Sequence, residues 1–268
     1  MAFRANIISL LEKLPALSFY AKTRGWHFIM AWIHRVTGIL LVIFVWIHMY
    51  FFSSPYGRGA HEVGAQGLGS LISALVQWIM AFPIIFHAFN GGRLILYEIY
   101  GHRAEEGMLR WMTGLGIIYL AVLGVVMLMG NQSASPFIFW LLIIALASIL
   151  SYGVGARIWR LGHSIFWRLQ RISATFLLVM IPAYMLFIHL APAANQGTGI
   201  VLPGIQKYFI QAVYLSLLAG TLYHAGYGIW SLVSDYLSSP ALRKALALLV
   251  TVVMVVFGWA GVTMIRSI

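Results

Sequence analysis

Two histidines hold matching places in two apolar segments of the chain. His87 is followed four residues later by Gly91, and His224 is followed at the same spacing by Gly228. A buried imidazole in lipid is costly, so it needs a partner. Two imidazoles in equivalent places predict a single partner bound from both sides, and a haem iron with two axial nitrogens meets this requirement.

The distance of each histidine from the nearest charged residue predicts its depth in the membrane. His87 comes six residues before Arg93, ~9 Å along a helix, and His224 comes eleven residues before Asp235, ~16 Å. Because both segments are expected to run inward, both histidines belong to the cytoplasmic half of the membrane. In an alternative interpretation, each imidazole donates to a backbone carbonyl of a neighbouring helix. The adjacent glycines favour the cofactor, since a flat macrocycle needs the backbone to approach closely.

The composition places the chain in a membrane. Of 268 residues, 62% are hydrophobic and only 9% are charged, which is typical of an integral membrane protein. The absence of cysteine excludes disulfides, thiolate-bound iron-sulfur clusters and thioether-attached haem within this polypeptide, so any cluster must belong to a partner. The net charge of +11 comes from basic residues between apolar segments, which argues against a nucleic-acid partner.

Seven apolar stretches are near or above the ~20 residues that a helical span needs. They cover roughly 28–53, 71–100, 109–130, 136–157, 171–191, 206–236 and 242–265. We therefore expect an all-α integral membrane protein with about seven transmembrane helices.

The distribution of basic residues predicts the orientation. If the N-terminus is cytoplasmic, fourteen of the seventeen Lys and Arg residues fall on the cytoplasmic side, and only Arg58, Lys207 and Arg266 fall outside. The C-terminus is then outside, in a bacterial-type cytoplasmic (inner) membrane. The segment from Met1 to Lys22 has no pattern of a cleavable signal and is interpreted as a short amphipathic helix on the cytoplasmic side.

The sequence also contains an internal repeat at an offset of 136 or 137 residues. The matched pairs are Arg35 with Arg171, Thr37 with Ser173, His87 with His224, Gly91 with Gly228, and Glu98 with Asp235. Each repeat holds three spans, so two copies with the same orientation need a linking helix. The predicted units are a first three-helix anchor repeat at 1–133, a linker transmembrane helix at 134–160 and a second repeat at 161–268, arranged as a parallel repeat. The first two helices of each repeat would form a four-helix bundle around the haem.

Several short motifs stand in the two halves of the chain. The first half contains Ile33-His34-Arg35-Val36-Thr37-Gly38 and His87-x-x-Asn90-Gly91-x-Arg93, and the second half contains His224-Ala225-x-x-Gly228-Ile229-Trp230, Ser234-Asp235-Tyr236 and Ala241-Leu242-Arg243. The first set resembles the larger cytochrome b membrane anchor of succinate dehydrogenases and fumarate reductases, the respiratory complex II family, and the second set resembles the smaller anchor. The chain thus looks like both anchors fused through one added helix, and the resemblance covers all of it except roughly residues 134–165.

This resemblance implies a set of functional residues. His87 and His224 would be the axial ligands of haem b. Arg35 and His34 would lie near a quinone oxygen or a haem propionate, close to the cytoplasmic surface, with Asp235 and Tyr236 on the opposing helix. A Tyr hydroxyl and a surface Asp suit a quinone that needs hydrogen-bond donors and protons. Equally, Arg and Asp at span ends are often interfacial anchors, and Tyr belongs to the aromatic belt.

Two further sequence features bear on these sites. Many members of the family carry Ser four residues before the arginine that corresponds to Arg35, where this chain has Ala31.

The spacing from Thr37 to His48 resembles that found in single-chain, two-haem anchors, in which such a histidine binds the distal haem. This resemblance predicts a second haem held by His48 and His189. Pro182 could kink the helix that carries His189. Alternatively, His48 bonds a neighbouring helix and His189 is an interfacial residue.

The resemblance implies electron transfer. Electrons from succinate would pass from a flavoprotein subunit through an iron-sulfur subunit, both on the cytoplasmic side, to a menaquinone or ubiquinone within the membrane lipids. The reverse direction would reduce fumarate with quinol, and the sequence does not decide between the two. Other interpretations are the cytochrome b anchor of a formate dehydrogenase or hydrogenase, and a non-redox transporter. A transporter would require helices broken at the membrane midplane and would leave the paired histidines unexplained.

Overall fold

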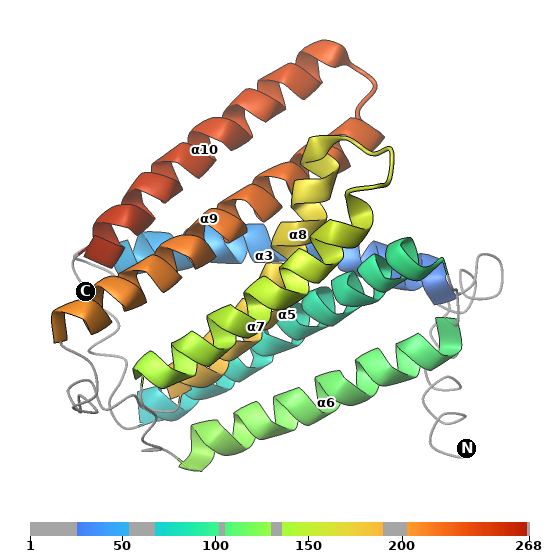
Figure 1. Cartoon of the computed structure of the whole chain (residues 1–268). Helices are drawn as coiled ribbons and strands as arrows, with labels where there is room; N and C mark the ends of the chain where they lie inside the picture. Colours follow the sequence, from blue (N-terminus) through green and yellow to red (C-terminus); the bar gives the residue numbers. More distant parts are fainter. Residues whose placement is uncertain (1–25, 54–67, 102–104, 130–135, 190–202, 267–268) are drawn as a thin grey trace.

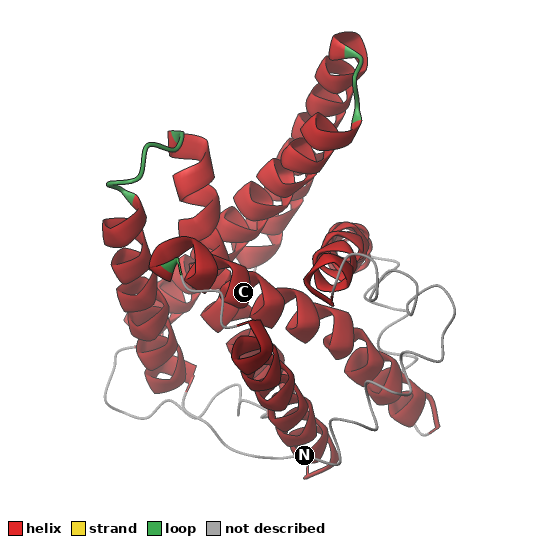
Figure 2. Ribbon diagram, turned by 90° about the vertical axis from the view of Figure 1, so that its right-hand side faces the viewer, coloured by secondary structure: helices red, strands yellow, loops and turns green. Residues whose placement is uncertain are grey.

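The fold is built entirely of α-helices in the part of the chain that the structure describes. The computed structural model describes residues 26–53, 68–101, 105–129, 136–189 and 203–266. The helices within these ranges are α3 (Trp26–Ser53), α5 (Leu68–Tyr100), α6 (Glu105–Met129), α7 (Pro136–Ile158), α8 (Ile165–His189), α9 (Pro203–Tyr236) and α10 (Pro240–Arg266). Figure 2 shows only helices and short loops in these ranges. The predicted all-α class of membrane protein is confirmed.

Six of these seven helices are long and apolar enough to cross a membrane, namely α3, α5, α6, α7, α8 and α10. The helix α9 is not among them, although its 34 residues would extend ~51 Å, well beyond the ~30 Å of a hydrocarbon core. Polar side chains such as Gln211, His224 and Asp235 lower its hydropathy. Because α9 contacts four other helices, protein covers much of it in place of lipid.

Four helices form a closed ring around the centre of the molecule. The helix α3 contacts α5, α5 contacts α8, α8 contacts α9, and α9 contacts α3. The diagonal partners in this ring are α5 with α9 and α3 with α8. A side chain that points inward from α5 can therefore meet one that points inward from α9.

Two outer helices cover this ring in equivalent ways. The helix α6 packs on α5 and α8, and α10 packs on α9 and α3. Exchanging the first three helices with the last three therefore reproduces the same set of contacts. Figure 1 shows α6 and α10 along opposite edges of the molecule. The residue boundaries of the three predicted units remain a prediction, and the predicted helix at Met1–Lys22 lies outside the described residues.

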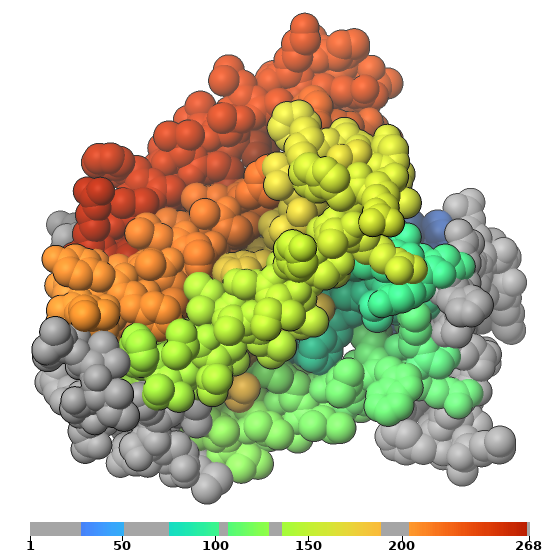
Figure 3. Space-filling view, viewed as in Figure 1, coloured from blue at the N-terminus to red at the C-terminus, as the bar shows by residue number. Residues whose placement is uncertain are grey.

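The helix α7 has no counterpart in this symmetry. It packs against α8 and α9 and touches α5, and it lies across the face of the molecule seen in Figure 3. Its Trp140 is fully buried in a cluster with Met180 of α8 and Val213 of α9. The helix α7 therefore packs tightly against helices of the second half of the chain.

The outward surface is apolar, as a membrane environment requires. Leu128 is 83% exposed and Trp259 is 72% exposed, and both belong to helices that are apolar enough to cross a bilayer. Such large exposed side chains would be costly in water and are accommodated by lipid. The polar side chains that carry chemistry are found instead on the inner faces and at the ends of the helices.

Candidate functional site

The two histidines singled out by the sequence face each other across the ring of four helices. His87 lies on α5 and His224 on α9, and their ring centroids are 6.2 Å apart with the ring planes at 82°. Because α5 and α9 are diagonal partners, the side chains rather than the helix backbones bridge the centre. The structure thus brings together two imidazoles that are 137 residues apart in the sequence.

The surroundings of His87 fix which ring nitrogen is free. Its Nδ1–H donates to the backbone oxygen of His34 at 3.1 Å, and the Thr37 hydroxyl lies 3.4 Å from the same nitrogen. The His34 ring stacks on the His87 ring, with centroids 4.0 Å apart and planes at 6°. A hydrogen bond at Nδ1 leaves the Nε2 lone pair of His87 as the available ligand.

Within the described ranges, two buried polar atoms near this pair have no hydrogen-bond partner: Oε1 of Gln170 and Nδ1 of His34. Gln170 lies on α8 and is 7% exposed, and its Nε2 donates to the backbone oxygen of His224 at 3.2 Å. Buried polar atoms are normally paired, so these unpaired atoms indicate that the site is incomplete as a protein-only arrangement.

The residues around the pair fit a haem better than a protein-only metal site. Within the described ranges, no group of three or more His, Cys, Asp or Glu side chains is placed to hold a metal ion. Two facing imidazoles are a sufficient protein donor set for a haem iron, because the porphyrin supplies the other ligands. The two rings are held by different helices, with their centroids 6.2 Å apart.

The repeated spacing from His to Gly places each glycine against a neighbouring helix. We expected Gly91 and Gly228 to leave room for a macrocycle. A Cβ atom at Gly91 would instead lie 3.4 Å from Cε1 of His34, and one at Gly228 would lie 3.8 Å from Nε2 of Gln170. Each glycine thus lies beside a side chain of the neighbouring helix in its own half of the molecule, at a distance where a Cβ atom would make ordinary van der Waals contact.

A second cluster lies where α3 and α9 meet, near the C-terminal end of α9. Arg35 donates through Nη1 to the Tyr236 hydroxyl at 2.5 Å. The Arg35 guanidinium carbon is 5.8 Å from the Trp32 ring centroid and 5.6 Å from that of Tyr236. Tyr236 is 51% exposed, and Asp235 beside it is also exposed. The predicted Arg35, Asp235 and Tyr236 therefore lie at one accessible junction, next to the His34 that stacks on His87.

The equivalent place in the other half holds a different arrangement. Arg171 on α8 donates to both carboxylate oxygens of Glu98 on α5, at 2.6 and 2.5 Å. The Arg171 guanidinium also lies over the Trp167 ring, 4.6 Å from its centroid. An arginine with a tryptophan one turn earlier thus recurs in both halves, but only Arg171 has a carboxylate partner among the described residues.

Comparison with known families agrees with this architecture. The model of the family described as "Succinate dehydrogenase/Fumarate reductase transmembrane subunit" matches residues 13–128 and 156–260. The chain belongs to this family. The two matched regions are consistent with a fused anchor subunit, and the stretch between them contains most of α7. No curated protein and no solved structure matches the chain.

Sequence reasoning missed part of this anchor's polar interior. Asn90 is fully buried and donates to the backbone oxygen of Met30 at 3.5 Å. Arg93, which is 4% exposed, donates to the Asn90 side chain at 2.9 Å and to the Tyr97 hydroxyl at 3.4 Å. Asn90 and Arg93 belong to the motif that follows His87, so the sequence already marked them as polar residues of this segment. Their role in joining α5 to α3 was not, because it depends on a partner backbone 60 residues away.

Of the two side chains predicted to hold a second haem, only that of His48 lies within the described residues. His48 is exposed on α3, and its ring centroid is 5.7 Å from that of Phe44. His189 ends α8, and its side chain lies outside the described residues. The helix α8 runs without a break through Pro182. The second haem therefore remains a prediction.

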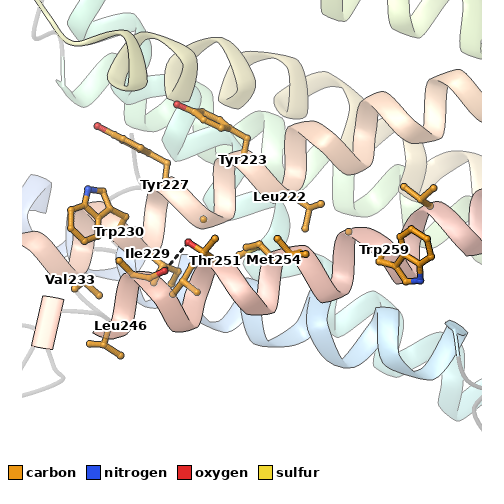
Figure 4. A pocket seen from close by; sticks show the side chains of 16 residues that line it. Leu222, Tyr223, Tyr227, Ile229, Trp230, Val233, Leu246, Thr251, Met254 and Trp259 are labelled. Carbon is orange, nitrogen blue, oxygen red and sulfur yellow. Dashed lines mark hydrogen bonds between the residues drawn. The ribbon is translucent and has the colours of Figure 1, made fainter. Parts of the chain in front are cut away.

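An apolar groove of about 660 Å³ lies between α9 and α10, away from the predicted site residues. Figure 4 shows Tyr223, Tyr227 and Trp230 in a row along α9, with Met254 and Trp259 on the facing side of α10. Among the described residues, neither a histidine nor a charged residue lines it.

Proposed function

We propose that this chain is the haem b-containing membrane anchor of a succinate:quinone oxidoreductase, which passes electrons from an iron-sulfur subunit to a membrane quinone. The single observation that carries the proposal is that a pair of facing imidazoles adjoins an accessible Arg–Tyr junction. Family membership supports the same role. The reverse reaction, from quinol to fumarate, uses the same residues.

The Arg35–Tyr236 junction is the proposed quinone site. Reduction of a quinone to a quinol takes up two electrons and two protons, so the site needs donors at the carbonyl oxygens and a proton supply. Arg35 and Tyr236 are both hydrogen-bond donors, and Arg35 also offers a positive charge to the oxygen that accumulates negative charge. Asp235 is exposed beside Tyr236 and would relay protons from the aqueous side. We infer that the quinone headgroup displaces the direct hydrogen bond between Arg35 and Tyr236.

His87 and His224 would hold haem b through their Nε2 atoms. A bound haem supplies a one-electron acceptor and donor close to the quinone site. The chain's own contribution is to fix the two rings: His34 and Thr37 engage Nδ1 of His87, and the ring stack with His34 limits its rotation. His34 then connects the haem ligand to the quinone site, because it is the neighbour of Arg35 in α3.

The partners follow from what this chain lacks. It contains no cysteine for a cluster, and from its family membership we infer that the clusters belong to an iron-sulfur subunit and that the dicarboxylate is oxidised on a flavoprotein subunit. We propose that both dock on the cytoplasmic side, where most of the basic residues are expected, with the N-terminus on that side and the C-terminus outside. The quinone is menaquinone or ubiquinone.

Purification of the chain from its native membrane tests this function. We expect a flavoprotein and a cluster-bearing subunit to copurify, a reduced b-type haem band in the optical spectrum, and succinate-dependent reduction of a short-chain quinone. A molybdenum enzyme among the copurifying proteins would redirect the assignment to another dehydrogenase. A preparation without any haem band would exclude the proposed ligand pair.

Haem stoichiometry tests the second site. If His48 and His189 hold a distal haem, each of the variants His48→Ala and His189→Ala lowers the haem content from two per chain to one. A content of two in both variants, or of one in the unaltered chain, would reject these ligands.

A further inference from the structure

The apolar groove between α9 and α10 (the α9–α10 groove) has the length of one membrane leaflet. Its wall on α9 runs from Leu222 to Val233, eleven residues or ~16 Å along the helix. Its wall on α10 begins at Leu246, and Figure 4 shows Val233 and Leu246 at the same end. A Cβ atom at Gly258 would lie 3.1 Å from Cδ1 of Leu222, so the two helices pack closely at the other end. The groove between these ends spans about half of the ~30 Å hydrocarbon core.

The walls of the groove offer hydrocarbon surface to an occupant. The Thr251 hydroxyl donates to the backbone oxygen of Ala247 at 2.8 Å, and the Tyr223 hydroxyl donates to the backbone oxygen of Phe166 at 2.8 Å. Figure 4 shows the hydroxyl ends of Tyr223 and Tyr227 pointing away from α10. The surface that remains is made of aliphatic side chains and aromatic rings, which suits an acyl chain.

The end of the groove that is expected to face the cytoplasm is positively charged. Arg243 and Lys244 come three residues before two lining residues of α10, so they share the side of the helix that faces the groove. Nε of Arg243 donates to the backbone oxygen of Leu237, which places the guanidinium where α9 ends and α10 begins. Lys244 is exposed beside it.

No carboxylate of the described residues is paired with either of these two cations. The nearest acidic residue in the sequence is Asp235, two residues after the lining residue Val233, and therefore about 200° around α9 from it. Asp235 thus faces away from the groove. The first turn of α10 contains no acidic residue, and the positive end of its helix dipole lies at the same place. The charge at this end of the groove is complementary to an anion.

We propose that the α9–α10 groove binds a phospholipid with an anionic headgroup, with one acyl chain along the groove and the phosphate between Arg243 and Lys244. Phosphate oxygens accept charge-assisted hydrogen bonds from both side chains, and basic residues beside a membrane attract anionic headgroups. A water-soluble anion would not match the apolar walls, and an uncharged lipid would not match the two cations. None of these residues belongs to the proposed haem or quinone site, so the lipid site does not depend on the proposed function.

Lipid retention by the purified complex tests the acyl-chain part of the site. The assembled complex is reconstituted in equal amounts of phosphatidylglycerol and phosphatidylcholine, extracted and washed in mild detergent, and the retained phospholipids are counted by mass spectrometry. We expect the unaltered complex to retain phosphatidylglycerol in preference to phosphatidylcholine. Ala247→Trp places an indole in the groove and should remove one phosphatidylglycerol per chain. Ala245→Trp, on the exposed face of the same helix, should retain it.

The same measurement tests the headgroup part of the site. Lys244→Gln should lower the preference for phosphatidylglycerol about fivefold, because one basic residue beside a membrane contributes ~1 kcal/mol of attraction to anionic lipid. Lys207→Gln is the matched control, since Lys207 is also exposed but lies near the opposite end of α9. Its lipid preference should equal that of the unaltered complex.

Equal retention of phosphatidylglycerol by the Ala247→Trp and Ala245→Trp complexes would overturn the proposal. The same holds if Lys244→Gln and Lys207→Gln show the same headgroup preference, and Lys244 is an exposed residue whose replacement leaves the packing of the bundle intact. If Ala247→Trp loses bound quinone while its phospholipid is unchanged, the groove holds a quinone tail and the proposal is rejected in favour of that occupant.

Discussion

Arg171 donates two hydrogen bonds to Glu98, at 2.6 and 2.5 Å, and so joins α8 to α5. The repeat makes this pair equivalent to Arg35 and Asp235. In that second place, however, Arg35 bonds the phenol of Tyr236. One arginine is thus neutralised by a carboxylate, and the other keeps a neutral partner that a substrate oxygen can replace. The two halves share a framework, but of these two equivalent arginines only Arg35 has a neutral partner among the described residues.

This difference gives a first prediction, on quinone reduction. Arg35→Gln should lower kcat/KM for a short-chain quinone by about 10- to 100-fold, the effect of losing a charge-assisted hydrogen bond. Arg171→Gln should leave kcat/KM within about threefold of the value for the unaltered chain. It removes an ion pair that lies away from the proposed quinone site, and loss of such a pair should change the rate by less than tenfold. Succinate-driven quinone reduction in the assembled complex, with haem content measured in parallel, checks both. Equal losses in the two variants would argue against a quinone site at Arg35.

A second prediction concerns the stability of the α5–α8 contact. The side chains of Arg171 and Glu98 are 25% and 31% exposed, so solvent screens their attraction only in part. The variants Glu98→Gln and Arg171→Gln should each cost about 1 kcal/mol, and the double variant should cost little more than either single one. Thermal unfolding in detergent measures all three. Additive losses in this double-mutant cycle would mean that the two side chains act independently.

The sequence predicted the helices and the facing histidines because both depend on local or repeated patterns. Runs of apolar residues define the spans, and the common offset relates His87 to His224. Contacts that depend on helix rotation were not predictable in this way. The stack of His34 on His87 and the hydrogen bond from Gln170 to His224 join residues 53 and 54 positions apart, and neither contact leaves a pattern in the sequence.

The glycines illustrate the same limit. Gly91 and Gly228 were visible as a repeated spacing, which indicated close approach by a neighbouring group. Their identity as glycine could not show whether that group was a cofactor or a side chain. Among the described side chains, the nearest atoms are those of His34 and Gln170. The polar residues of α9 were likewise recognisable in the sequence. Their presence in a long helix is explained only by the contacts of α9 with four other helices.

A third prediction uses the close approach of α3 to the His87 ring. A Cβ atom at Gly38 would lie 3.0 Å from Cε1 of His87, so Gly38→Ala forces the ring to move by a few tenths of an ångström. The repeat places Ala174 at the equivalent position of the second half, so only the His87 side has this requirement. We expect Gly38→Ala to reduce the haem content per chain and to alter the low-spin electron paramagnetic resonance signal.

Gly114→Ala is the control for that substitution. Gly114 lies on α6, and a Cβ atom there would meet nothing within 4 Å. Its haem content and spectrum should match those of the unaltered chain. A normal spectrum in Gly38→Ala would show that the His87 ring has more freedom than its contacts with His34 and Thr37 indicate.

The last prediction tests how α10 closes the ring of helices. Gly261 is buried where α10 meets α9 and α3, and a Cβ atom there would lie 2.7 Å from Cδ2 of Leu218 and 2.9 Å from Cε of Met49. Gly261→Val therefore has to push both neighbours aside, and such overpacking typically costs about 1–3 kcal/mol. Gly153 on α7 has open space around it, so Gly153→Val should be nearly neutral. Thermal unfolding of the two variants measures the difference. If Gly261→Val unfolds at the same temperature as Gly153→Val, then α10 is free to move outward from α3 and α9, and its contact with both helices contributes little to the stability of the bundle.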